Sequence, residues 1–172
     1  MNKTVKEILS WFSYIAGAVV LGLLLNNFVL AAAVVDSASM ENTIMTNSRV
    51  MGLRVAYVFN DPERFDIILF ESPFEYEPTP FVKRIIGLPN ETINIVGGKV
   101  FIDGAHEPLY EPYLIFEPQG NFGPFIVPEG EFFVMGDNRN ISNDSRHWGF
   151  VPRGDIIGRL YFEFFPSLTW LN

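Results

Sequence analysis

The stretch "TINIVGGKVFID" (residues 92–103) decides the fold class of this 172-residue chain. Two runs rich in Val, Ile and Phe flank the pair Gly97-Gly98. Paired glycines accept the positive φ angles of a two-residue hairpin turn. A phosphate-binding loop would need a helix after the glycines, whereas the residues that follow have the composition of a strand. The stretch therefore predicts an antiparallel β-hairpin.

Similar short runs lie on both sides of this hairpin. They are rich in Val, Ile, Phe and Tyr, are bounded by Gly, Pro, Asn and Asp, and occupy residues 49–59, 65–71, 81–88, 125–136 and 158–166. Strands without helices between them predict a mainly β domain, built as an antiparallel β-sheet sandwich or pseudo-barrel. The acidic, Pro-rich segments 70–80 and 107–124 are expected to be surface loops.

The N-terminal part of the chain has a different character. Residues 14–35 form a stretch of 22 residues without a charge, which as a helix is long enough to cross a hydrocarbon core of about 30 Å. Asn26 and Asn27 interrupt this stretch, so a cleavable signal peptide is the alternative. We expect a retained transmembrane anchor because the stretch is long and because Trp11 and Tyr14 lie where interfacial aromatic residues are common.

The expected domains are thus a cytoplasmic tip and membrane anchor at residues 1–35 and an extracytoplasmic β-rich domain at residues 36–172. The basic residues that flank the span do not decide its orientation, because Lys3 and Lys6 precede it and Arg49 and Arg54 follow it. We expect a single pass with the N-terminus in the cytoplasm, because a large folded domain is translocated largely regardless of its charge. The lipid bilayer is therefore a predicted partner.

The composition argues against several classes of function. The net charge is −8, with 12 basic and 20 acidic residues, which is unfavourable for binding nucleic acid. The absence of cysteine excludes disulfides, thiolate nucleophiles and cysteine-based zinc sites. The two histidines do not form a His-Glu-x-x-His pattern. We therefore expect no metal and no cofactor.

The segment "FVKRIIGLP" (81–89) places adjacent cations in an apolar strand. Lys83 and Arg84 would lie on opposite faces of that strand, so at least one of them points inward. Burial can lower the pKa of a lysine from about 10.4 by roughly 3–5 units, whereas arginine stays above about 12. Lys83 is therefore the candidate general base, and Arg84 is expected to be a structural or pairing cation. The alternative is that Lys83 snorkels or pairs with a carboxylate.

Two further segments contain clustered polar side chains. "SASM" (37–40) places Ser37 and Ser39 directly after the apolar stretch, and "MGDNRNISNDSRHWGFVP" (135–152) is the densest polar cluster of the chain. On composition alone the second segment is typical of a turn-rich, solvated loop. No Gly-x-Ser-x-Gly elbow is present, which excludes an α/β-hydrolase triad.

Taken together and in this order, "SASM", "FVKRIIGLP" and "MGDNRNISNDSRHWG" resemble the nucleophile, base and C-terminal signature boxes of bacterial type I signal peptidases. "RFDIILF" (64–70) resembles a further box of that family. The resemblance extends from the membrane anchor to about Pro152, and the short segment between Lys83 and Gly136 resembles the smaller, Gram-positive-type enzymes. Members of this family are Ser–Lys endopeptidases on an antiparallel β scaffold, which cut signal peptides from exported preproteins.

The resemblance implies a role for each matching residue. Ser39 looks like the nucleophile that forms an acyl-enzyme, and Lys83 looks like its general base. Ser37 matches the residue whose hydroxyl can join the Ser39 amide in an oxyanion hole, and Ser142 matches the serine that helps to orient the lysine. The resemblance further implies a supporting ion pair between Asp144 and Arg146, with Asp137 and Arg139 in the same scaffold. Substrates are expected to carry small side chains at the first and third positions before the cut.

The sequence departs from the family pattern near the nucleophile. The family usually has Ser-Met-x-Pro-Thr, whereas Asn42 stands here in place of the proline and Asp36 precedes the first serine. Asparagine tolerates turn geometry, so the catalytic turn is expected to survive with less rigidity.

Two alternatives to a signal peptidase stay open. A Ser–Lys self-cleaving regulator would need a DNA-binding domain, and this chain has an apolar span instead. A non-enzymatic, membrane-anchored β module in secretion or surface assembly would keep the strands, but it gives no reason for a lysine inside an apolar strand opposite hydroxyls.

Overall fold

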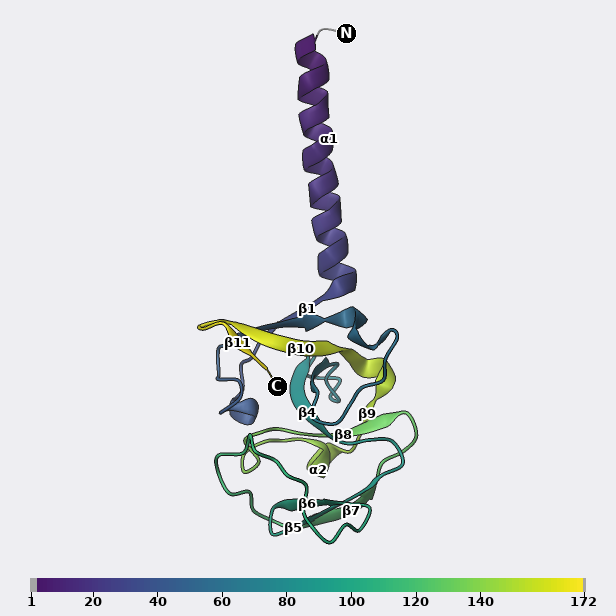
Figure 1. Ribbon diagram of the computed structural model, residues 1–172, viewed down its shortest axis with the longest axis vertical. Helices are drawn as coiled ribbons and strands as arrows, with labels where there is room; N and C mark the ends of the chain where they lie inside the picture. Colours follow the sequence, from purple (N-terminus) through teal and green to yellow (C-terminus); the bar gives the residue numbers. More distant parts are fainter. Residues whose placement is uncertain (1–2, 172) are drawn as a thin grey trace.

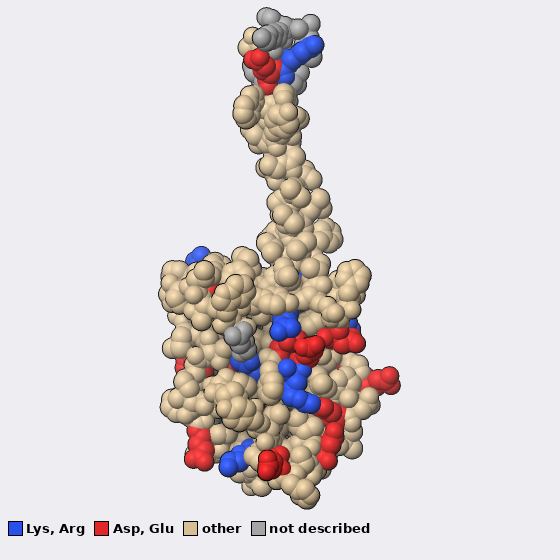
Figure 2. Space-filling model, in the orientation of Figure 1, with Lys and Arg blue, Asp and Glu red and all other residues tan. Residues whose placement is uncertain are grey.

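The computed structural model describes residues 3–171 as a long N-terminal helix joined to a β domain (Figure 1). The helix α1 (Lys3–Leu24) continues into one π-helical turn, Leu25–Val29. Its segment Ser10–Val29 has 20 residues, is apolar enough to cross a membrane and is not buried against the domain. Figure 2 shows no Lys, Arg, Asp or Glu along this shaft. The helix therefore fits the predicted transmembrane span.

The helix ends earlier than the sequence predicted. Leu30–Val34 form strand β1, which pairs antiparallel with β2 (Arg49–Leu53). Ala31 and Val35 are buried in the domain core, so the sheet and not lipid covers these apolar side chains. The prediction of one helical span through residue 35 is wrong for these last residues. Residues 1–2 and 172, the ends of the two expected segments, lie outside the described residues.

The main sheet has the strand order β1-β2-β10-β3-β4-β8-β9, with β11 paired to β10. Its other strands are β3 (Ile67–Phe70), β4 (Phe81–Gly87), β8 (Glu131–Met135), β9 (Val151–Pro152), β10 (Ile156–Phe165) and β11 (Thr169–Trp170). Each neighbouring pair is antiparallel. The predicted mainly β, antiparallel fold class is confirmed.

The smaller sheet has the order β6-β5-β7 and contains the predicted hairpin. Its strands are β5 (Thr92–Val96), β6 (Lys99–Ile102) and β7 (Phe122–Ile126). Gly97 and Gly98 have φ angles of 57° and 79°, as a primed turn requires. The run 125–136 was expected to be one strand, but a turn at Gly130, with φ 74°, divides it between the two sheets.

Buried apolar side chains join these layers. One cluster contains Ala31, Val50 and Leu160 of the main sheet together with Met40 and Ile44, which follow the serine segment. A second cluster joins the two sheets, with Ile86 and Phe133 packed near Ile93 and Val100. Short helical turns connect the strands: Ala38–Met40, Arg54–Tyr57 and Arg153–Asp155 are 3₁₀ turns, and α2 (Ser145–Trp148) is a single α-helical turn. The serine segment therefore rests directly on the core.

Candidate active site

Ser39 lies in the 3₁₀ turn that follows β1. The next residue, Met40, is fully buried, and its carbonyl accepts hydrogen bonds from the backbone N–H groups of Thr43 and Ile44 at 3.1 and 2.8 Å. Asn42 has a φ of 86°, which a proline ring, with φ fixed near −65°, does not allow. The turn therefore differs from one that the family's usual proline would adopt, and the core fixes its position.

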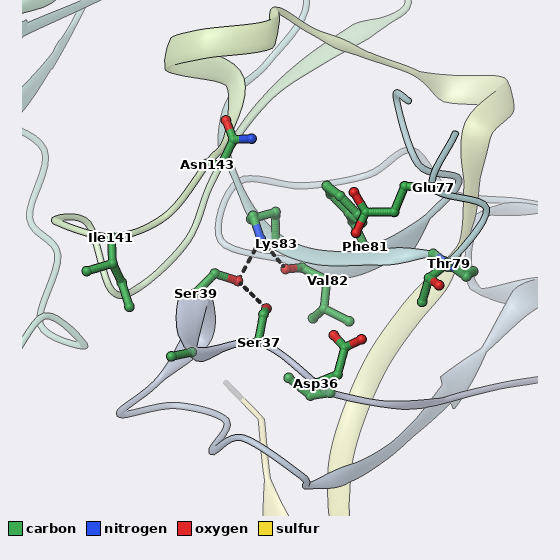
Figure 3. A pocket seen from close by; sticks show the side chains of 13 residues that line it. Asp36, Ser37, Ser39, Glu77, Thr79, Phe81, Val82, Lys83, Ile141 and Asn143 are labelled. Carbon is green, nitrogen blue, oxygen red and sulfur yellow. Dashed lines mark hydrogen bonds between the residues drawn. The ribbon is translucent and has the colours of Figure 1, made fainter. Parts of the chain in front are cut away.

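Lys83 reaches this turn from strand β4. Its side chain is buried, and its Nζ lies 2.7 Å from Ser39 Oγ and 3.2 Å from the carbonyl of Val82 (Figure 3). Ser37 Oγ lies 3.1 Å from Ser39 Oγ. Segments 44 residues apart in the chain thus bring two hydroxyls and one amine together.

Burial lowers the pKa of Lys83 to about 8, and the charges of Asp144, Asp137 and Asp36 act in the opposite direction. With that pKa, about one tenth of the lysine is neutral at pH 7. The pKa of Lys83 is lowered, as predicted, but by less than the 3–5 units that full burial can produce. The remaining carboxylate charges explain the difference.

Arg84 points to the other face of β4 and is also buried. Its Nε and Nη2 donate to the two oxygens of Asp137 at 2.9 and 2.7 Å. Asp137 also accepts a hydrogen bond from the Thr43 hydroxyl. The expectation that Arg84 is a pairing cation is confirmed. Through Asp137, the strand that carries the lysine is tied to the turn that carries the serine.

Arg139 does not share this pair. Its guanidinium forms an ion pair with the carboxylate of Glu111, in which Nη1 lies 2.9 Å from Oε2. Its Nε donates a hydrogen bond to the carbonyl of Gly136 at 3.1 Å. The Tyr113 hydroxyl donates to Glu111 at 2.6 Å, and the guanidinium of Arg84 lies 4.0 Å from the centre of the Tyr113 ring. The structure therefore adds Glu111 and Tyr113 to the expected scaffold.

Residues 107–121 form a loop, as expected, although Glu111 and Tyr113 are partly buried in it. The expectation is wrong for residues 122–124, which belong to β7. Nothing in the local sequence separates Glu111 and Tyr113 from Glu107 and Tyr110, which are exposed in the same loop. Their partial burial reflects contacts with Arg139 and Arg84, which lie far away in the chain.

The expected ion pair between Asp144 and Arg146 is present. Arg146 Nε lies 2.8 Å from one oxygen of Asp144, and Nη2 lies 2.9 Å from the other. Asp144 also accepts the backbone N–H of Gly136 at 3.0 Å, and Arg146 donates to the carbonyl of Arg139 at 2.7 Å. This pair therefore fixes the backbone of the segment that faces the serine turn.

That segment approaches the turn that carries Ser39 very closely. The Asn138 N–H donates to the carbonyl of Ser39 at 3.0 Å. A Cβ added to Gly136 would lie 2.4 Å from the same carbonyl oxygen and 2.3 Å from Ser142 Oγ. Ser142 is buried, but its hydroxyl has no hydrogen-bond partner within residues 3–171. The structure thus places Ser142 beside the site without a bond to Lys83, and its expected role in orienting the lysine stays a prediction.

A cavity of about 280 Å³ opens beside the Ser39–Lys83 contact. Residues 35–39 form one wall, residues 79–83 form the other, and Glu77, Ile141 and Asn143 complete the lining. In the described part of the chain, no group of three or more His, Asp or Glu side chains is placed to hold a metal ion. What the cavity offers is two hydroxyls and a partly neutral amine.

Comparison with known proteins gives the site a context. The family described as "Signal peptidase, peptidase S26" matches residues 8–165. The chain belongs to this signal peptidase family. It is 44% identical to a signal peptidase I of Leptolyngbya laminosa, over 87% of this chain and 75% of that protein. It is 36% identical to signal peptidase I P of Bacillus subtilis subsp. natto, over 95% of this chain and 92% of that protein.

A crystal structure of a signal peptidase I from Enterococcus faecalis V583 is also similar, with 36% sequence identity and a TM-score of 0.51. The match covers 58% of this chain and 97% of that chain. The resemblance to type I signal peptidases, including the smaller Bacillus forms, is therefore confirmed. The chain is an enzyme that cleaves signal peptides, and preproteins that carry them are its substrates. The alternative of a non-enzymatic β module is thereby excluded.

Proposed function

We propose that the chain is a membrane-anchored serine endopeptidase in which Ser39 is the nucleophile and Lys83 the general base. The observation that carries this proposal is the 2.7 Å contact between Lys83 Nζ and Ser39 Oγ in a buried setting. A lysine with a lowered pKa can accept a proton near neutral pH, and it needs no histidine to activate a hydroxyl.

The proposed reaction has two stages. Neutral Lys83 takes the Ser39 proton while Ser39 Oγ attacks the carbonyl carbon, and the oxyanion is stabilised by the Ser37 hydroxyl and the Ser39 amide. Lys83 then gives the proton to the leaving amine, which leaves an acyl-enzyme on Ser39. In the second stage Lys83 takes a proton from water, the resulting hydroxide attacks the ester, and Ser39 leaves with the proton.

The surrounding polar residues hold this geometry. Asp137 and the Asp144–Arg146 pair position the lysine strand and the segment that contacts Ser39. Arg139 supports the same segment through the carbonyl of Gly136. We include Ser142 as a lysine-orienting residue because the family resemblance implies it and because its buried hydroxyl adjoins the site.

We also propose that Ser10–Val29 is a retained single-pass anchor, with the N-terminus in the cytoplasm and the catalytic domain outside the membrane. The folded domain would then begin at Leu30 with β1, rather than at residue 36. Only ten residues separate Val29 from Ser39, which supports a position of the nucleophile near the bilayer surface, where the cleavage site of a signal peptide also lies. An extended substrate presents alternate side chains to the enzyme, which agrees with small residues at the first and third positions before the cut.

The experiment that tests the dyad is cleavage of a preprotein by the full chain in liposomes. Ser39→Ala and Lys83→Arg should each abolish cleavage, because the first removes the nucleophile and the second replaces the base with a group whose pKa stays above about 12. Lys99→Arg, at an exposed position on β6, is the matched control and should leave the rate unchanged. Substantial activity of Lys83→Arg would refute the assignment.

A further inference from the structure

The cavity beside the dyad contains two carboxylates that the proposed reaction does not use. Its ionisable lining side chains are Asp36, Glu77 and Lys83. Asp36 and Glu77 are exposed, and within residues 3–171 neither side chain takes part in an ion pair or a hydrogen bond. When Lys83 is neutral and competent as a base, the remaining formal charges on the cavity lining are therefore both negative.

The two carboxylates come from different walls of the cavity. Asp36 follows β1, and Glu77 belongs to the loop that leads into β4. Figure 3 shows Asp36 next to Ser37 and Glu77 near Phe81, on either side of the β4 ribbon in that view. A peptide that lies between the walls would lie close to both groups.

Within the described residues, the sheet has an open strand edge beside each wall of the cavity. β1 is the terminal strand of the main sheet, and β4 pairs with β8 only from Arg84 onward. Peptides commonly add a strand to such open edges, and their alternate side chains then point to opposite faces. Val82, Lys83 and Ser39 are buried at the floor of the cavity, whereas Asp36 and Glu77 are exposed at its mouth. If the first and third side chains face the floor, the second and fourth face the mouth.

We propose that Asp36 and Glu77 select substrates with a basic side chain at the second or fourth position before the cut, and that they disfavour an acidic side chain there. This inference rests on the proposed function of the same cavity. It specifies the substrates beyond their small residues at the first and third positions. Solvent screens charges at exposed positions, so the effect is modest. Attraction of lysine and repulsion of glutamate by two carboxylates should therefore separate the two substrates about twofold to thirtyfold.

The test uses soluble peptides that are identical except for Lys, Gln or Glu at the second position, with a matched series at the fourth. The full chain in detergent should give a higher kcat/KM for Lys than for Glu in at least one series, mainly through KM. The ratio should fall as the ionic strength is raised from about 10 mM to about 1 M, because the Debye length shrinks from roughly 30 to 3 Å.

Variants identify the groups responsible. Asp36→Asn and Glu77→Gln should each reduce the Lys-to-Glu ratio, and the double variant should bring it close to one. Glu75→Gln is the matched control, since Glu75 is exposed in the same loop but does not line the cavity. Asp36→Asn also changes the pKa of Lys83, so the ratio of two peptides on one enzyme is the proper measure, and not the absolute rate.

The inference and the proposed dyad fail in different ways. Loss of the dyad assignment would appear as cleavage of the Gln peptide by Ser39→Ala. The charge preference is also measured without turnover, as the dissociation constants of the Lys and Glu peptides from the inactive Ser39→Ala chain. Equal rates and equal affinities for the Lys and Glu peptides in both series would overturn the inference. So would a preference that survives in the double variant.

Discussion

At the scale of single residues, the bond between Lys83 and Ser39 can run in either direction, and the protonation state of the lysine decides which. A charged ammonium donates to Ser39 Oγ, which can then donate to Ser37 Oγ, 3.1 Å away. A neutral amine accepts the Ser39 proton instead, and Ser37 is then free to donate. The same arrangement of Lys83 Nζ, Ser39 Oγ and Ser37 Oγ is therefore compatible with a resting state, in which the lysine is charged, and with the proposed reactive state, in which it is neutral.

This switch predicts how activity depends on pH. The pKa of Lys83 is lowered to about 8, and only the neutral form is a base, so kcat/KM should rise with pH through about 8 and then level off. A profile measured on an uncharged peptide from about pH 6 to about pH 10 checks this. Because the charge of Asp36 raises the pKa of Lys83, Asp36→Asn should move the rise to lower pH. A flat profile across this range would contradict the assignment of Lys83.

Ser37 should have a smaller effect than the dyad. Ser37→Ala removes one proposed oxyanion donor while the Ser39 amide remains, and loss of one such donor typically lowers kcat about 10²–10³-fold. Single-turnover rates and thermal melting would separate the lower kcat caused by a missing oxyanion donor from one caused by loss of structure. Ser167→Ala, at an exposed position far along the chain, serves as a control. An unchanged kcat would mean that the oxyanion hole is formed by backbone groups.

At the scale of structural elements, the serine turn depends on one unusual backbone angle. Asn42 has a φ of 86°, and its buried Nδ2 has no hydrogen-bond partner in the described part of the chain. Asn42→Pro, which introduces the usual family residue, should therefore destabilise the protein by more than about 1 kcal/mol and reduce activity. Asn42→Gly keeps access to positive φ and should retain both the stability and the activity of the protein. Chemical denaturation measures the stability, and peptide cleavage measures the activity. An active, stable proline variant would contradict the conclusion that the turn requires a positive φ at residue 42.

The contact between the serine turn and the segment after β8 should be equally sensitive. A Cβ on residue 136 would lie 2.4 Å from the backbone carbonyl of Ser39, and backbone cannot rotate out of the way as a side chain can. Gly136→Ala should therefore displace Ser39 from Lys83 and greatly lower kcat. Gly154→Ala, where a Cβ meets nothing within 4 Å, is the matched control. Wild-type kcat in Gly136→Ala would show that the segment yields without disturbing the dyad.

At the scale of the whole molecule, the N-terminal apolar helix and the β domain meet at Leu30. A chain that starts at Leu30 retains β1 and should fold and cleave soluble peptides. A chain that starts at Asp36 loses the pairing of β1 with β2 and the buried side chains of Ala31 and Val35. It should melt at a lower temperature and lose activity. Equal melting temperatures of the two shortened chains would show that β1 is dispensable.

The anchor itself should matter mainly for embedded substrates. Tethering enzyme and preprotein to one bilayer raises their effective concentration without a new contact. The full chain should therefore have a lower apparent KM than the Leu30 form on a preprotein in liposomes, and a similar KM on a short soluble peptide. Equal rates on the embedded preprotein would mean that the helix acts only in targeting.

Strands and candidate site residues of this protein could be predicted from sequence wherever the pattern that indicates them lies within one short segment. The hairpin at Gly97-Gly98 follows from two adjacent residues and their flanking strands, and the candidate base follows from a cation pair inside one apolar strand. Ser39 and Lys83 were named from such local segments and from the family resemblance. The pairing of Arg84 with Asp137 and the place of Glu111 were not predicted.

The sequence by itself determined the β class, the apolar helix and the candidate reactive side chains, because turn angles, strand periodicity and side-chain chemistry depend on near neighbours. Only the tertiary structure decided that Leu30–Val34 join the sheet, that Asn42 adopts a left-handed φ and that Lys83 lies 2.7 Å from Ser39. The burial that lowers the pKa of Lys83 comes from the same folding. Each of these features depends on contacts between residues far apart in the chain, such as the 53 positions between Arg84 and Asp137, and no local pattern records which distant group will be there.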